Sequence, residues 1–252
     1  MLALAVLPAV LAVAFATHPA FLEDLWPLPR TGDGTFVFLA SILAAAAAST
    51  AWAAWQGETV SFGGIALDVM VIFWPLALWL PIRVPAERGG GITAVSVVAV
   101  VAAVFGTWLA TRTVRAPFID RRPTPRLVRV GFAVFVVTLT LVGGAVVAGR
   151  PNTVPWSVSA DLSVMIGLIF RGAASYFVFG LARPGWTNAG GQLAGFLAYD
   201  LVLIPPLAGK AGSIPGYWRD SLWAYLAVLV ASGLIAAWYL FLDRRTRLVA
   251  RP

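Results

Sequence analysis

The stretch VGFAVFVVTLTLVGGAVVA, residues 130–148, contains nineteen residues and no charge. A helix of about 20 apolar residues, which rises about 1.5 Å per residue, crosses the roughly 30 Å hydrocarbon core of a bilayer. Similar runs recur along the chain, and we place spans at 2–17, 35–55, 62–82, 92–111, 127–148, 159–182, 189–208 and 221–242. The sequence therefore predicts an all-α, polytopic transmembrane helical bundle of about eight spans, which forms a single integral membrane domain over residues 1–252.

The composition agrees with this fold and excludes several functions. Hydrophobic residues make up 60% of the chain and charged residues 12%, whereas soluble domains are about half apolar and a quarter charged. The chain has no cysteine and one histidine, His18, so we predict no metal site and no bound cofactor. The net charge of +7 comes from arginines in short loops, which favours anionic lipid over nucleic acid as a partner.

The loop charges predict the orientation of the chain. With both termini in the cytoplasm, eleven basic residues lie inside and six outside, as the positive-inside rule requires. The densest basic run, residues 112–129, is then cytoplasmic. The first span also resembles a signal peptide, whose removal would leave seven spans, but it lacks a basic segment before Leu2, so we favour a retained helix. The high ratio of arginine to lysine suggests a bacterial plasma membrane.

Two charged residues lie near the middle of the sixth and seventh spans. Charges in hydrocarbon are costly, so Arg171 and Asp200 are candidates for a substrate or ion site. A short connection makes these spans neighbours, and the depths of the two residues allow an ion pair. We interpret the pair either as the lining of a polar cavity or as a structural pair that joins two helices. Tyr176, Tyr199 and Gln192 are near enough in sequence to add hydrogen bonds under either interpretation.

A third charged residue, Asp68, lies about six residues into the third span and has no obvious cationic partner at its depth. It is explained by binding a proton, by reaching water near the interface or by meeting Arg171. We include it among the candidate site residues, and we predict no catalytic residue, because the sequence shows no Walker A loop, no nucleophile elbow and no zinc motif.

The seventh span combines a Gly-x-x-x-Gly pair, Gly191 and Gly195, with the dipeptide Pro205–Pro206. The glycines predict close approach of another helix, and the prolines predict a break at the outer end of the span. The segments SFGG at 61–64 and NAGG at 188–191 each open a span that carries an acid, which suggests an inverted repeat. The segments differ almost everywhere else, so we expect no repeat.

Three functions fit these observations. The first is a membrane transporter or permease with a charged site between the sixth and seventh spans. The second is a non-catalytic membrane subunit that anchors a larger complex and binds partner subunits. The third is an intramembrane enzyme that modifies a lipid or isoprenoid with Asp68 or Asp200 as the acid. We favour the transporter, and we expect the chain not to be an enzyme.

Overall fold

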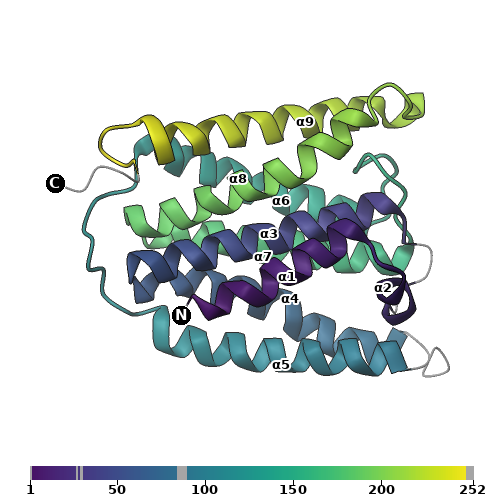
Figure 1. Ribbon diagram of the computed structural model, residues 1–252, viewed down its shortest axis with the longest axis horizontal. Helices are drawn as coiled ribbons and strands as arrows, with labels where there is room; N and C mark the ends of the chain where they lie inside the picture. Colours follow the sequence, from purple (N-terminus) through teal and green to yellow (C-terminus); the bar gives the residue numbers. More distant parts are fainter. Residues whose placement is uncertain (1, 27, 29–30, 84–89, 248–252) are drawn as a thin grey trace.

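A computed structural model describes residues 2–26, 28, 31–83 and 90–247, and describes Glu23, Asp24, Leu25 and Gly90 by their backbone alone. In these residues the fold is a bundle of long helices (Figure 1). The helices are α1 (Ala3–Thr17), α2 (Ala20–Leu25), α3 (Asp33–Gln56), α4 (Phe62–Arg83), α5 (Gly90–Thr113), α6 (Arg126–Val147), α7 (Ala160–Ala182), α8 (Trp186–Gly209) and α9 (Gly216–Ala237). A 3-10 turn, Thr59–Ser61, precedes α4, and a π-helical segment, Trp238–Leu242, continues α9.

Seven of these helices, α3 to α9, are long and apolar enough to cross a membrane. Their bounds agree with the predicted spans to within a few residues, and the largest difference is that α9 begins at Gly216 and not at 221. α1 has 15 residues and so extends about 22 Å, which is shorter than a full hydrocarbon core. α1 packs along α3 and leaves Val6, Leu7 and Val10 exposed, as expected of a helix whose outer face meets lipid.

The predicted break in the seventh span is wrong. α8 runs without interruption through Pro205 and Pro206 to Gly209. The two prolines leave the carbonyl oxygens of Leu201 and Val202 without their intrahelical donors, and membrane helices tolerate this loss through neighbouring groups and local adjustment of the backbone. α4 likewise contains Pro75 and Pro81 within a single helix.

Eight of the helices form two halves with the same arrangement. α1 packs against α3 and α4 against α5 in the first half, as α6 packs against α7 and α8 against α9 in the second half. Between the halves, α3 contacts α8 and α4 contacts α7. A two-fold rotation that exchanges α3 with α7, and α4 with α8, converts one of these contacts into the other. Each half holds four helices, so equivalent helices run in the same direction along the bundle (Figure 1), and the halves are parallel repeats.

Residue positions repeat with a period of 127. α3 begins at Asp33 and α7 at Ala160, and the Gly-Gly pairs at 63–64 and 190–191 have the same separation. From the sequence we expect no repeat and consider only an inverted one, so the parallel repeat is a correction. With this period, Asp68 corresponds to Gly195 and not to Asp200. The two halves share few identical residues, because packing in lipid constrains the size of a side chain at a helix crossing more than its identity.

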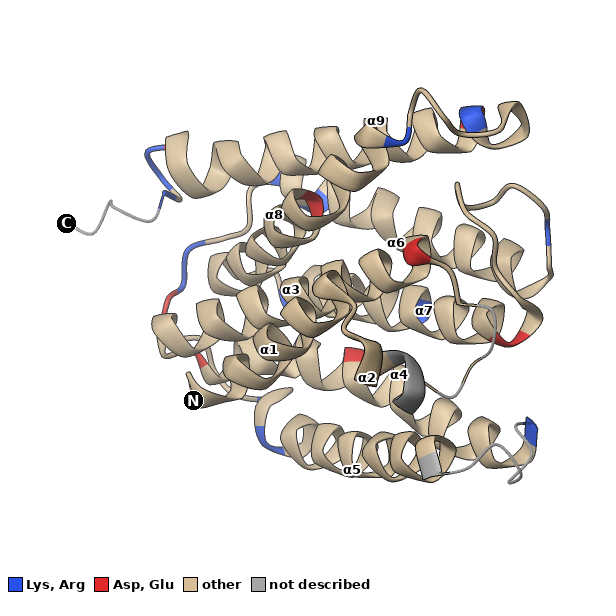
Figure 2. Cartoon of the chain, turned by 45° about the vertical axis from the view of Figure 1, so that its right-hand side comes forward, with Lys and Arg blue, Asp and Glu red and all other residues tan. Residues whose placement is uncertain are grey.

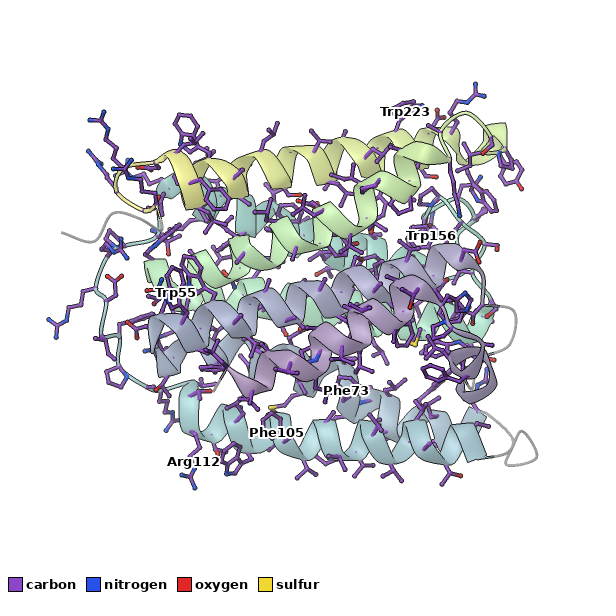
Figure 3. All side chains as sticks on the ribbon, in the orientation of Figure 1. Trp55, Phe73, Phe105, Arg112, Trp156 and Trp223 are labelled. Atoms are coloured by element: carbon purple, nitrogen blue, oxygen red, sulfur yellow. The ribbon has the colours of Figure 1, made fainter. Side chains whose placement is uncertain are left out.

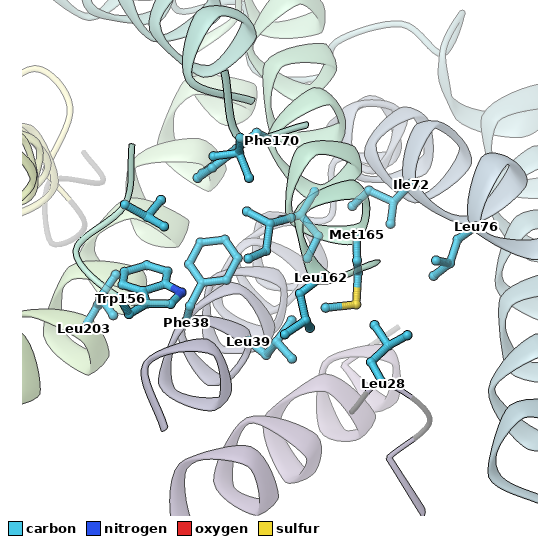
Figure 4. Packing of buried hydrophobic residues seen from close by; sticks show 14 of the residues in the cluster. Leu28, Phe38, Leu39, Ile72, Leu76, Trp156, Leu162, Met165, Phe170 and Leu203 are labelled. Carbon is cyan, nitrogen blue, oxygen red and sulfur yellow. The ribbon is translucent and has the colours of Figure 1, made fainter. Parts of the chain in front are cut away.

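The main hydrophobic core lies between the halves. Phe38 from α3, Phe170 from α7 and Leu203 from α8 are buried and converge there with Trp156 from the α6–α7 connection (Figure 4). The ring centroids of Phe38 and Phe170 are 5.6 Å apart, and those of Phe38 and Trp156 are 5.8 Å apart. These large rings fill the space between α3 and α7.

The two ends of the bundle differ in charge. The start of α1 and the end of the π-helical segment that continues α9 lie at one end (Figure 1), which we call the terminal end. The arginines described at this end are Arg112, Arg115, Arg121, Arg122, Arg126, Arg129, Arg183, Arg244, Arg245 and Arg247, whereas Arg83, Arg150, Lys210 and Arg219 are described at the opposite end (Figure 2). Trp55 lies at the terminal end, and Trp156 and Trp223 lie at the opposite end (Figure 3).

Candidate functional site

The predicted site residue Tyr176 lies where the two halves meet. Its ring, on α7, packs so closely against Gly64 of α4 that a Cβ at this glycine would overlap it. Its hydroxyl oxygen is 3.4 Å from the position that a Cβ of Gly191, on α8, would occupy. Tyr176 therefore touches both halves at once, and two glycines make room for it.

The α3–α8 crossing beside Tyr176 is joined by side-chain hydrogen bonds. The hydroxyl of Ser49 donates to the carbonyl oxygen of Gly191 at 2.9 Å, and the indole Nε1 of Trp52 donates to the carbonyl oxygen of Thr187 at 3.0 Å. Ser49 and Trp52 are 3% and 5% exposed. Gly195 also lies against Ser49, so both residues of the predicted Gly-x-x-x-Gly pair face α3, which confirms close helix approach there.

Gln192 is a second predicted residue at the centre of the bundle. Its side chain is 1% exposed, and its Nε2 donates to the carbonyl oxygen of Tyr176 at 2.6 Å. Its Oε1 fills the space above Gly180 on α7 and has no hydrogen-bond partner in the described part of the chain. The amide therefore joins α7 to α8 and leaves one buried acceptor unused.

Asp200 faces α9 and not α7. Its Oδ2 accepts a hydrogen bond from Ser232 at 3.0 Å, and the residue is 2% exposed. Its Oδ1 is buried without a hydrogen-bond partner among the described residues. Ser232 is also the polar residue of a shallow pocket, whose lining is Val128, Gly131, Phe132, Phe135, Leu193, Phe196, Ser232 and Ile235. Ser232 therefore connects the carboxyl group of Asp200 to this pocket.

Tyr199, next to Asp200 in sequence, points toward the core between α3 and α9. Its hydroxyl is hydrogen-bonded to the hydroxyl of Tyr225 on α9. Its ring meets that of Phe38 edge-on, with 6.3 Å between the centroids. Tyr199 therefore connects the two halves through α3 and connects α8 to α9.

Asp68 lies at the α4–α7 crossing. Its carboxylate lies beside Gly172 of α7, in the space that a side chain at position 172 would need. Ile72 lies against the same glycine. Its Oδ1 has no hydrogen-bond partner among the described residues, although the residue as a whole is partly exposed. Asp68 is thus the predicted acid that lies between the halves.

Arg171 does not meet Asp200. Its side chain is exposed on the outer face of α7, whereas Asp200 faces α9. The ion pair among the described residues joins Arg122 to Asp120. The short connection between the two spans predicts that these residues face each other, and this prediction is wrong. α7 instead packs mainly against α6 and α4, and α8 against α3 and α9, so the residues point in different directions. The residue next to Arg171, Gly172, contacts Asp68.

The basic segment between α5 and α6 crosses the terminal end as an ordered strap, residues 114–125. Glu58 is 1% exposed, and its carboxylate accepts the backbone N–H groups of Ile119 and Asp120 at 3.1 and 2.5 Å. The guanidinium of Arg183 donates to the carbonyl oxygens of Val114 and Ala116, each at 2.7 Å. Connections from both halves therefore hold the strap.

Within the strap, Asp120 and Arg122 form an ion pair, in which Nη2 of Arg122 lies 2.6 Å from Oδ2 of Asp120. Partial burial raises the pKa of Asp120, but the hydrogen bonds from Arg122 and its positive charge outweigh that effect and hold the pKa below its ordinary value. Arg122 also donates to the carbonyl oxygen of Arg245 at 3.2 Å, and so joins the strap to the segment after α9.

Sequence reasoning missed Ser49, Trp52, Glu58, Ser232 and Tyr225. None of these residues shows a sequence signal of its own, because serines and aromatics are common in membrane helices and Glu58 lies in a short connection. Their roles depend on which helices cross. Comparison of the chain with protein-family models, curated proteins and solved structures found no match.

Proposed function

We propose that this chain is a membrane transporter whose two halves move against each other around polar residues at their junction. The observation that carries the proposal is the parallel repeat, in which α3 contacts α8 and α4 contacts α7. Transporters built from parallel repeats bind substrates near the bilayer midplane, at the interface between the repeats. Tyr176, Ser49 and Asp68 lie at this interface.

The buried acids supply a reason for coupling to protons or small cations. Asp68 and Asp200 each have an oxygen without a hydrogen-bond partner, and neither forms an ion pair with a described residue. An ionised carboxylate in such a place is costly, and binding of a proton or cation removes that cost. Since Asp68 lies between the halves, a change in their contact would alter its surroundings, and so would link cation binding to motion.

The orientation follows from the charged ends. We place the terminal end in the cytoplasm, since it holds most of the described arginines. The strap then lies at the cytoplasmic surface, where its exposed Arg115 and Arg121 face anionic headgroups. With α1 as an eighth crossing, both termini are cytoplasmic. We assign the chain to a bacterial plasma membrane.

Cysteine labelling tests this proposal without knowledge of the substrate, because the chain has no native cysteine. The Ser49→Cys variant places a thiol between the halves, and Ala99→Cys, 1% exposed on α5, is a control in a contact within one half. We expect a membrane-impermeant maleimide to label Ser49→Cys from each side of native vesicles, and not to label Ala99→Cys. We also expect Asp68→Asn to change the ratio of labelling between the two sides.

A rigid anchor subunit gives a different result. In that case, both cysteines stay unlabelled from either side in intact vesicles and react fully after denaturation. This outcome would refute motion between the halves. A transporter whose coupling ion is a proton should also acidify proteoliposomes that contain a pH-sensitive dye under an imposed potential, and Asp200→Asn should reduce that flux while Asp161→Asn, at a helix end, should not.

A further inference from the structure

The position of Arg171 is unusual for a membrane helix. It is the twelfth of the 23 residues of α7, so it lies about 17 Å from either end of the helix. Its side chain is exposed on the outer face, between the contacts that α7 makes with α4 and with α6. An arginine near the midpoint of a span normally faces the interior of a bundle or pairs with an acid.

Lipid headgroups do not account for this arginine. Long basic side chains reach headgroups from positions near helix ends, but Arg171 is too far from both ends for its side chain to cover the distance. Among the described residues, no acid forms an ion pair with it. A counter-charge at the same depth on another membrane protein would balance it.

The same face carries an acid. Asp68 lies beside Gly172, the neighbour of Arg171, and is partly exposed as a residue, although its Oδ1, which has no hydrogen-bond partner among the described residues, is itself buried. Around the two charges, the accessible residues are uncharged: Val71 and Pro75 on α4, and Val164, Leu168, Ser175 and Val178 on α7. We call these residues, with Asp68 and Arg171, the α4–α7 face.

We propose that the α4–α7 face binds a second copy of this chain, with Arg171 of each copy paired with Asp68 of the other. A two-fold dimer uses the same surface on both subunits, so a face that contains both an arginine and an aspartate satisfies both charges twice. Ser175 is small and lets the two α7 helices approach closely. The proposal does not depend on the transport function, since an anchor subunit with this face would dimerise in the same way. In a transporter, Arg171 of the second copy and the coupling cation are alternative partners of the Asp68 carboxylate.

Cross-linking tests this interface. In native membranes we expect oxidised Ser175→Cys to give a covalent dimer of twice the mass of the chain. Val137→Cys is the matched control, because it is 59% exposed at a similar depth on α6 but lies outside the α4–α7 face, and we expect it to stay monomeric. Adding Arg171→Gln to Ser175→Cys should lower the cross-linked fraction more than about tenfold, since it leaves the aspartate of the other copy unpaired. Adding Arg171→Lys keeps the charge and should preserve most of the dimer.

Two results would overturn the proposal. One is a monomeric mass for the purified chain in lipid nanodiscs together with no dimer from Ser175→Cys, which would mean that Arg171 meets Asp68 within one chain. The other is a Ser175→Cys product of a different mass, which would mean that a different membrane protein supplies the acid. If Arg171→Gln fails to accumulate, Asp68→Asn provides the same test, because it removes the other half of each pair.

Discussion

Gly190 on α8 lies directly against the indole ring of Trp52 on α3, with no room for a Cβ between them. The equivalent pair in the other crossing is Gly63 on α4 and Phe179 on α7, where a Cβ would lie 2.7 Å from the ring. These two contacts set how closely the halves approach each other.

Enlarging either glycine should therefore destabilise the protein. We expect Gly190→Ala and Gly63→Ala each to lower the free energy of unfolding by about 1–3 kcal/mol, because the extra methyl group forces a buried ring to move. Gly131→Ala and Gly144→Ala are controls, since no atom lies within 4 Å of the added Cβ. Thermal unfolding in detergent, followed by tryptophan fluorescence, measures the difference. Equal melting temperatures for all four variants would show that the crossings are looser than described.

Glu58 should control the order of the strap. Glu58→Ala removes the acceptor of the N–H groups of Ile119 and Asp120, and each hydrogen bond to a charged group contributes about 1.5–3 kcal/mol. We expect trypsin to cut the variant at Arg121 or Arg122 faster than it cuts the wild type, with the membrane helices intact. Asp220→Ala, an exposed acid at the opposite end, is the control. Unchanged cleavage at the strap would mean that Arg183 alone holds it.

The paired hydroxyls of Tyr199 and Tyr225 should behave as one unit. Tyr199→Phe or Tyr225→Phe alone leaves the other hydroxyl without its partner, and each should lower stability by about 1 kcal/mol. The double variant should be no less stable than either single variant, because it removes both polar groups together. A double-mutant cycle on the melting temperatures measures the coupling. Additive losses would show that the two hydroxyls act independently.

The amino-acid sequence by itself determined that the chain folds as a bundle of long apolar helices, and where they begin and end. Stretches such as residues 130–148 cannot leave their backbone groups unpaired in hydrocarbon, so each must form a helix wherever the other helices lie. The arginine-rich end was also predicted from the sequence, because most of the arginines lie between the apolar spans.

Only the tertiary structure decided which helices touch. Arg171 and Asp200 occupy neighbouring helices in sequence, yet Asp200 meets Ser232 and Arg171 faces outward, since chain order does not set the rotation of a helix about its axis. The repeat was hidden for a similar reason: Trp52 and Phe179 are equivalent in packing but differ in type. In lipid no apolar stripe marks the inner face of a helix, so close steric fit between small and large residues decides the pairing.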